Sequence, residues 1–241
     1  MTMPLPLLTA RRLVRLPTVW GWLLLLVSML AASWAAASRV YPFLAVTELA
    51  PGARTLVVEG WIDAAELEDV APFLRGHRYE RVLVTGGPVL AWADTQVLVS
   101  SAERAAVYLR RHGVDAPPVL AVPAPASAQD RTFLSAVMVR EWAAREHVPL
   151  DAIDVFSAGA HARRTRTLYR LALGSSAEVG IVATPPREFD AARWWRSSAA
   201  AKSVLGETIG LAWTTCCFWP PEPGSHEERW AAPPSASTPP H

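Results

Sequence analysis

The chain of 241 residues contains no asparagine, and its single lysine is Lys202. Without asparagine it has no acceptor for N-linked glycosylation. With one lysine, a phosphate-binding lysine after a glycine-rich loop or a Schiff-base lysine is excluded at every other position. The motifs GxGxxG, GxxxxGK, GxSxG and HExxH are also absent, which excludes most of the enzyme classes that such motifs identify.

Charged residues are scarce, and their signs almost cancel. They make up 19% of the sequence, against 51% hydrophobic residues, and the formal net charge is +1. A nearly neutral chain has no general attraction for polyanions, so we expect no nucleic-acid partner. The apolar composition indicates instead that part of the chain meets lipid.

Residues that usually hold metals or form disulfides are few and poorly spaced. Cys216 and Cys217 are adjacent, where ring strain disfavours a mutual disulfide, and they cannot form a CxxC pair. Five of the six histidines share no metal-ligand spacing: His77, His112, His147, His226 and His241. We therefore predict no metal site, and the sequence identifies neither a cofactor nor an oligomeric state.

Residues 18–37 contain no charge and are long enough, at about 1.5 Å per helical residue, to cross a bilayer. Arg11, Arg12 and Arg15 precede this segment, while only Arg39 follows it closely. The positive-inside rule then places residues 1–17 in the cytoplasm. We expect a single-pass protein of the inner (plasma) membrane with its domain on the extracytoplasmic side.

A cleaved signal peptide is the alternative, because residues 35–37 are three alanines that resemble a cleavage site. The apolar run is longer than the roughly 7–15-residue core of a signal peptide, which favours an uncleaved anchor. At the other end, residues 220–241 are rich in proline and serine and are expected to form a disordered tail. One domain, over residues 49–219, remains between the two.

Five short runs rich in β-branched residues are predicted to be strands: residues 55–59, 81–85, 119–122, 153–156 and 179–184. Apolar residues that recur every three or four positions predict helices between and after them: residues 64–74, 102–112, 131–147, 160–171 and 191–212. This alternation predicts a three-layer, Rossmann-like α/β domain with a mainly parallel five-stranded sheet.

In a sheet of this kind, ligands bind outside the carboxyl ends of the strands. The rule selects small or polar residues that follow the predicted strands: Glu59-Gly60, Thr85-Gly86-Gly87, Asp130, residues 157–161 and Thr184-Pro185. The loop of small residues that begins at Ser157 leads into a helix start, which is a natural anion site.

The helix that opens there is unusually basic, since it carries Arg163, Arg164, Arg166 and Arg170. Arginine in the first turn opposes the helix dipole unless an anion lies nearby, and its guanidinium group binds phosphate or carboxylate. The alternative is that these arginines are solvated or pair with acids such as Glu178 and Asp190. His161 at the same helix start is a candidate general acid or base, or else a polar residue without chemistry.

Other candidates each have a structural alternative. Asp130 precedes a helix that it would cap by default, and Glu103 follows Ser100 at the spacing of a capping box. Gly86 and Gly87 permit close approach of a ligand to the backbone, but glycine also serves ordinary turns.

The sequence resembles the YdcF-like family, in its membrane-anchored branch of SanA- and ElyC-type envelope proteins. The resemblance covers residues 54–205 and rests on segments in the order VVEG, RVLVTGG, SAERAAVYLRRHGV, DRTFLSA and SAGAHARRTRTLYR. It implies a Rossmann-like fold and an envelope-associated role, but no particular reaction. The site positions it implies are Gly86, Gly87, Glu103, Asp130, Thr132, His161 and Arg164. Family members often carry an asparagine shortly after the threonine, where this chain has residues 134–136 as Leu-Ser-Ala.

These observations predict an anchored extracytoplasmic domain that binds, and in the stronger form hydrolyses, an anionic phosphate-bearing envelope metabolite. His161, Asp130 and Glu103 are the predicted catalytic residues, and we expect them to meet Arg164 in one pocket. The predicted ligand contacts are Gly86, Gly87, Thr132, Ser157 and Arg164. The alternative is a non-catalytic binding or scaffold module of the envelope, which would expose a large apolar patch.

Overall fold

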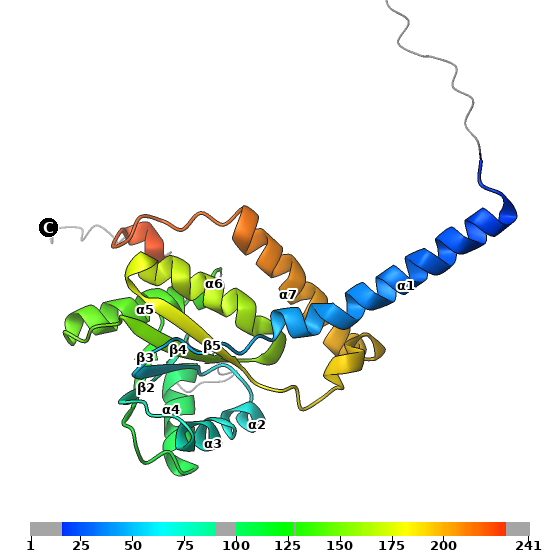
Figure 1. Ribbon diagram of the computed structural model, residues 1–241. Coiled ribbons are helices and arrows are strands. Elements are labelled where there is room, and N and C mark those ends of the chain that lie inside the picture. Colours follow the sequence, from blue (N-terminus) through cyan, green and yellow to red (C-terminus); the bar gives the residue numbers. More distant parts are fainter. Residues whose placement is uncertain (1–15, 90–99, 128, 230–241) are drawn as a thin grey trace, which may run out of the picture. The chain divides into compact units, whose positions relative to one another are not determined.

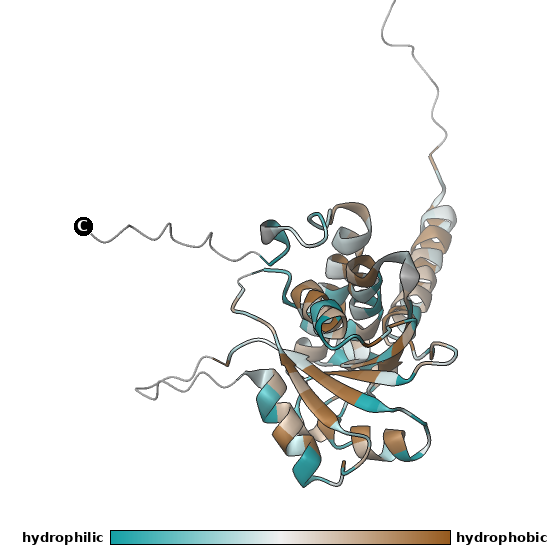
Figure 2. Cartoon of the chain, turned by 90° about the vertical axis from the view of Figure 1, so that its left-hand side faces the viewer, coloured by the Kyte–Doolittle hydropathy of each residue, from teal (hydrophilic) through white to brown (hydrophobic). Residues whose placement is uncertain are grey.

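The computed structural model describes residues 16–89, 100–127 and 129–229 (Figure 1). The chain divides into two units at Ala37 and Ser38, and the first contains most of helix α1 (Val19–Leu44). This helix is long and apolar enough to cross a membrane, with apolar residues along most of its length (Figure 2). Most of the predicted N-terminal segment and the end of the predicted tail lie outside the described residues.

The second unit is built on a five-stranded sheet. Its strands are β1 (Thr55–Glu59), β2 (Arg81–Gly86), β3 (Val119–Pro123), β4 (Ala152–Ser157) and β5 (Glu178–Ala183). Their order is β3-β2-β1-β4-β5, and every neighbouring pair is parallel. The predicted α/β fold with a parallel five-stranded sheet is therefore confirmed.

Helices cover both faces of the sheet (Figure 1). One layer contains α5 (Arg131–Arg145) and α6 (Ala162–Leu173), and the other contains α2 (Ala64–Leu67), α3 (Val70–Arg75) and α4 (Ser101–Arg111). The remaining elements are η1 (Gly159–His161), η2 (Gly174–Ser176), η3 (Ala191–Arg196), α7 (Ser198–Cys216) and η4 (His226–Arg229).

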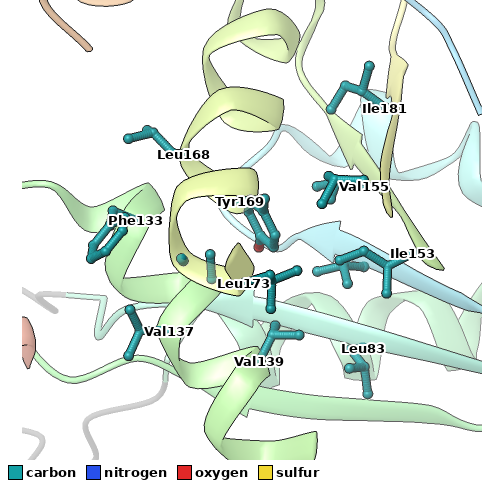
Figure 3. Close-up of a cluster of buried hydrophobic side chains, with 14 of the residues drawn as sticks. Leu83, Phe133, Val137, Val139, Ile153, Val155, Leu168, Tyr169, Leu173 and Ile181 are labelled. Carbon is teal, nitrogen blue, oxygen red and sulfur yellow. The ribbon is translucent and has the colours of Figure 1, made fainter. Parts of the chain in front are cut away.

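Alternate side chains of β1 point into the two layers, as the strand period of two requires. Leu56 and Val58 belong to one cluster of buried residues, whereas Val57 belongs to the other. Figure 3 shows the second cluster, in which Tyr169 of α6 lies between helix and strand side chains. Because both faces of the central strand are buried, the sheet fixes the position of the residue that ends it.

Two predicted helices are interrupted in the structure. The helix expected over residues 64–74 is divided between α2 and α3, and the one expected over residues 191–212 begins as η3 before α7. Ser197 causes the second interruption, because its backbone is extended and its hydroxyl caps α7 by accepting from the Ala200 N–H.

The chain after α7 also differs from the expectation of a disordered tail starting at residue 220. Element η4 contacts α5, where Glu228 is buried and its Oε2 lies 2.6 Å from the Arg140 guanidinium group. Arg229 pairs with Glu141 on the same helix. These contacts were not predicted from the sequence, because the segment is dominated by proline and serine and contains few charged residues.

Cys216 and Cys217 form a disulfide with each other. The expectation that ring strain would keep the two adjacent thiols apart is therefore wrong. The pair lies at the end of α7, where the helix gives way to Cys217 as its capping residue.

Candidate functional site

The candidate site lies where β1 and β4 end side by side. The connections from these two central strands lead to opposite edges of the sheet, which makes this the topological switch point where α/β proteins bind ligands. Glu59 is the last residue of β1, and Ser157 is the last residue of β4. The geometry of the sheet therefore brings a carboxylate and a hydroxyl together.

Glu59 is an acid in an almost fully buried position, since only 1% of it is exposed. Its Oε2 accepts hydrogen bonds from the hydroxyls of Ser157 and Thr165, the latter at 3.2 Å. Its Oε1 has no hydrogen-bond partner among the described residues. A buried carboxylate oxygen without a donor is costly, so it needs an explanation in terms of function or of a bound group.

His161 lies near that free oxygen, with its Nε2 3.9 Å from Oε1 of Glu59. The imidazole is 7% exposed, its Nδ1 lies 3.0 Å from Oε1 of Glu207, and its Nε2 lies 3.3 Å from the Thr132 hydroxyl. The Nη2 of Arg164 also lies 3.1 Å from Nδ1, so this ring nitrogen faces both a donor and a carboxylate acceptor. In the tautomer whose Nδ1–H donates to Glu207, Nε2 accepts from Thr132. Such a ring is oriented by one carboxylate and presents a basic nitrogen at the other side.

Glu207, on α7, also holds the side chain of Arg164. The Nε of Arg164 lies 2.8 Å from Oε2 and its Nη2 lies 3.2 Å from Oε1. Burial raises the pKa of Glu207, but hydrogen bonds from His161 and Arg164 outweigh burial and lower the pKa to about 2. The charge of Arg164 is therefore already balanced inside the protein.

Asp130 and Thr132 reach the site from the start of α5. Asp130 has a left-handed backbone, with φ 47° and ψ 37°, and its side chain makes no capping hydrogen bond. Partial burial raises the pKa of this carboxyl group, while the nearby Arg164 opposes the rise. The expected side-chain cap is thus absent, and Asp130 belongs to the surroundings of Arg164.

Gly86, Gly87 and Glu103 gather around the start of α4. Gly86 has φ +150°, and a Cβ atom there would lie 2.0 Å from the Ser101 hydroxyl oxygen. Ser101 donates its N–H to the carbonyl of Gly87 at 2.8 Å. Glycine at position 86 is therefore required by the approach of α4.

Glu103 completes the capping box predicted from its spacing. Its Oε2 accepts from the N–H and hydroxyl of Ser100, at 2.9 and 2.8 Å, and these bonds lower the pKa of the carboxyl group. In the described part of the chain, no hydrogen bond of Glu103 reaches His161 or Arg164. The structure thus brings together Asp130, Thr132, Ser157, His161 and Arg164, and it groups Glu103 with the two glycines.

A cavity of about 300 Å³ lies beside His161, and its lining does not include Thr132. Its aromatic walls are Tyr41, Trp61 and Phe189, and the edge of Trp61 meets the imidazole at a centroid distance of 4.9 Å. Four carboxylates line it, from Asp63, Glu66, Glu188 and Glu207, against the single guanidinium group of Arg187. Arg187 itself pairs with Asp69, so the cavity is acidic.

Burial and the acidic environment also shift the pKa values of groups that line the cavity. Burial and the charge of Glu66 raise the pKa of Tyr41 to about 12. Burial likewise raises the pKa of Glu66, although hydrogen bonds from the Asp63 N–H and from Thr184 oppose the rise. The cavity therefore offers an anion no favourable electrostatic interaction.

Two further arginines of α6, Arg163 and Arg166, have partners within the domain. The guanidinium group of Arg163 lies 4.1 Å above the ring of Phe43. Arg166 pairs with Glu48 and donates to the carbonyl of Val179 at 2.8 Å. The partners differ from the acids expected from the sequence, but the pairing itself accounts for these two charges without a ligand.

The site also contains Glu59, which the rule of strand ends selected without giving it a role, and Trp61 and Glu207, which were not selected. Glu59 and Glu207 each carried a further signal in the sequence. Glu59 follows three apolar residues at the end of its strand, and Glu207 is the one charged residue between Lys202 and Glu222. A lone acid in an apolar stretch is costly unless it is paired.

No group of three or more histidine, cysteine or acidic residues suited to a metal ion occurs within residues 16–89, 100–127 and 129–229. Comparisons with protein-family models, curated proteins and solved structures find no match for the chain. The resemblance to the YdcF-like family therefore stays a prediction from the motifs.

Proposed function

We propose that the chain is a membrane-anchored envelope protein whose site binds a phosphate-bearing metabolite and hydrolyses it with His161 as general base. The observation that carries this proposal is the chain of contacts from Thr132 through His161 to Glu207. A base oriented by a carboxylate and facing a hydroxyl is an arrangement that activates water or a hydroxyl group.

The phosphate group binds on the Thr132 side of His161 in this proposal. The first turn of α5 presents the positive end of a helix dipole there and contains Arg131, while the carboxylate of Asp130 lies at the N-cap just before it. The cavity beside His161 carries four carboxylates, so in this proposal it holds the part of the ligand that has no negative charge. Arg164 supports phosphate binding less than expected, because Glu207 already pairs with it.

In the proposed reaction, Nε2 of His161 takes a proton from water while the water oxygen forms a bond to phosphorus. The bond from phosphorus to the leaving oxygen breaks, and the same imidazole returns the proton to that oxygen. Glu207 holds the ring and stabilises its positive charge between the two transfers. General base catalysis of this kind contributes about 10²- to 10⁴-fold to a rate.

The test uses the full-length protein in detergent, with p-nitrophenyl phosphate and bis(p-nitrophenyl) phosphate as probes. We expect His161→Ala to lower turnover at least about a hundredfold, with a smaller change in KM. His112→Ala is the matched control, since His112 is exposed at the end of α4 and contacts only its own helix through Nδ1. Equal turnover in both variants would refute the role of His161.

Anchoring and topology belong to the same proposal. Helix α1 supports the anchor by length and composition, and the arginines before it support a cytoplasmic N-terminus. A reporter that is active only outside the cytoplasm, fused after Arg229, should be active in cells. A soluble mature chain that begins near Ser38 would show that the segment is a cleaved signal peptide.

A non-catalytic module of the envelope is the second candidate, and one observation favours it. Such a module was expected to expose an apolar surface, and α7 has exposed Leu205, Ile209 and Trp213. If neither phosphoester probe is turned over, a binding role becomes the better account of the site.

A further inference from the structure

Helix α7 has one face that belongs to the domain. Ala200, Val204 and Thr214 are buried, and Glu207 on the same side makes the hydrogen bonds to His161 and Arg164. The spacing of these residues matches a single helical face. This face holds the helix against η1 and α6.

The opposite face is apolar and open. Leu205, Ile209 and Trp213 follow one another at intervals of four, and they are 52%, 70% and 47% exposed. We call these three residues the α7 stripe. Single exposed apolar residues are common, but three in line on one helix form a continuous patch that usually meets a partner.

No charge lies within the α7 stripe, and the exposed Lys202 lies one turn before it on the same face of the helix. From residue 203 to residue 221 the only charged side chain is Glu207, which points to the site and not to the α7 stripe. Trp195 and Trp219, near the two ends of α7, are 38% and 85% exposed. Tryptophan at the borders of an apolar surface is typical of the interface between lipid headgroups and acyl chains.

The position of the membrane segment in the sequence favours lipid over a second protein. The domain unit begins at Ser38, directly after the apolar residues of α1, so no long linker separates the domain from a bilayer that α1 crosses. A domain of this length has a radius of gyration of about 16 Å, so a short connection keeps the domain as a whole within a few tens of ångströms of that bilayer. A second copy of this chain, by contrast, would reach the α7 stripe only after diffusing to it.

We propose that the α7 stripe rests in the interface of the membrane that α1 spans. Leu205, Ile209 and Trp213 contact the boundary of headgroups and acyl chains, and Glu207 on the other face stays in the site. The inference rests on the anchoring part of the proposed function and is independent of hydrolysis. It would place the helix that orients His161 at the lipid surface.

The experiment measures the depth of a spin label in vesicles of phosphatidylethanolamine and phosphatidylglycerol. The full-length protein with Cys216→Ser and Cys217→Ser receives a nitroxide at Ile209→Cys, and a second preparation receives it at Leu205→Cys in case the first does not fold. Leu120→Cys is the matched control, because Leu120 is 39% exposed on the edge strand β3.

We expect the α7 labels to collide more with oxygen and less with a water-soluble nickel complex than the Leu120 label. The depth should be about 5–10 Å into the boundary of headgroups and acyl chains. Nickel collisions equal to those of the control would overturn the proposal, as would protection from both reagents with spin–spin broadening, which indicates a second copy. Loss of the protein from the membranes in an alkaline wash would instead show that anchoring itself fails.

Discussion

Replacing Glu207 by glutamine should remove a stabilising interaction whose size depends on pH. The carboxylate is hydrogen-bonded to His161 and Arg164, and its side chain is only 19% exposed. The lowering of its pKa from 4.5 to about 2 corresponds to about 3 kcal/mol of folding free energy at neutral pH. We expect Glu207→Gln to lose stability of that order, to within about a factor of two.

The sign follows from the direction of the shift. Because the pKa of Glu207 is lower in the folded than in the unfolded chain, its contribution is complete above pH 4.5 and is lost as pH falls toward 2. The difference in stability between the parent protein and the variant should therefore be largest near pH 6. It should shrink steadily over the acidic range.

Urea unfolding of the full-length protein in non-ionic detergent, followed by circular dichroism at several pH values, measures this difference. Glu188→Gln is the control, since Glu188 lines the same cavity but is exposed. Its effect should stay within about 0.5 kcal/mol. A difference for Glu207→Gln that is the same at pH 6 and pH 2.5 would refute the ion-pair explanation.

Three further changes test the fold around the site. Glu228→Gln should destabilise the domain by about 1–3 kcal/mol, because Glu228 is buried against Arg140, whereas the exposed Glu227→Gln should be nearly neutral in the same urea titration. Gly86→Ala should cost about 1–3 kcal/mol or abolish folding, since its Cβ would meet the Ser101 hydroxyl. Gly206→Ala should raise the urea midpoint, because nothing lies within 4 Å of a Cβ there and alanine favours a helix over glycine by about 1 kcal/mol.

The fold was predictable because strand and helix periods dominate this sequence. Each predicted strand matches an observed one to within a residue at either end, since strands covered on both faces read as apolar runs. The break before α7 was not predictable from periodicity, because it depends on the backbone of Ser197.

The site was predictable only where topology alone determines position. His161 and Thr132 follow strands or start helices, so the rule of strand ends brought them together. Glu207 comes from the middle of α7, and no local pattern shows which face of that helix will meet His161. Arg164 was identified, but its partner proved to be a protein carboxylate where a ligand had been expected.

The strand order also has a consequence for how the polypeptide is made. β1 lies at the centre of the sheet, and its partner β4 pairs Ile153 with Thr55, almost a hundred positions earlier in the chain. During synthesis, one edge of β1 therefore stays unpaired until β4 has been made. An unpaired apolar strand edge is prone to pair with the wrong strand. The carboxylate of Glu59 also lacks its hydrogen-bond donors at that stage, because the hydroxyls of Ser157 and Thr165 are added only with β4 and α6. The nascent domain thus depends on its second half to protect its first strand, and this period before completion is when a holding chaperone would matter most.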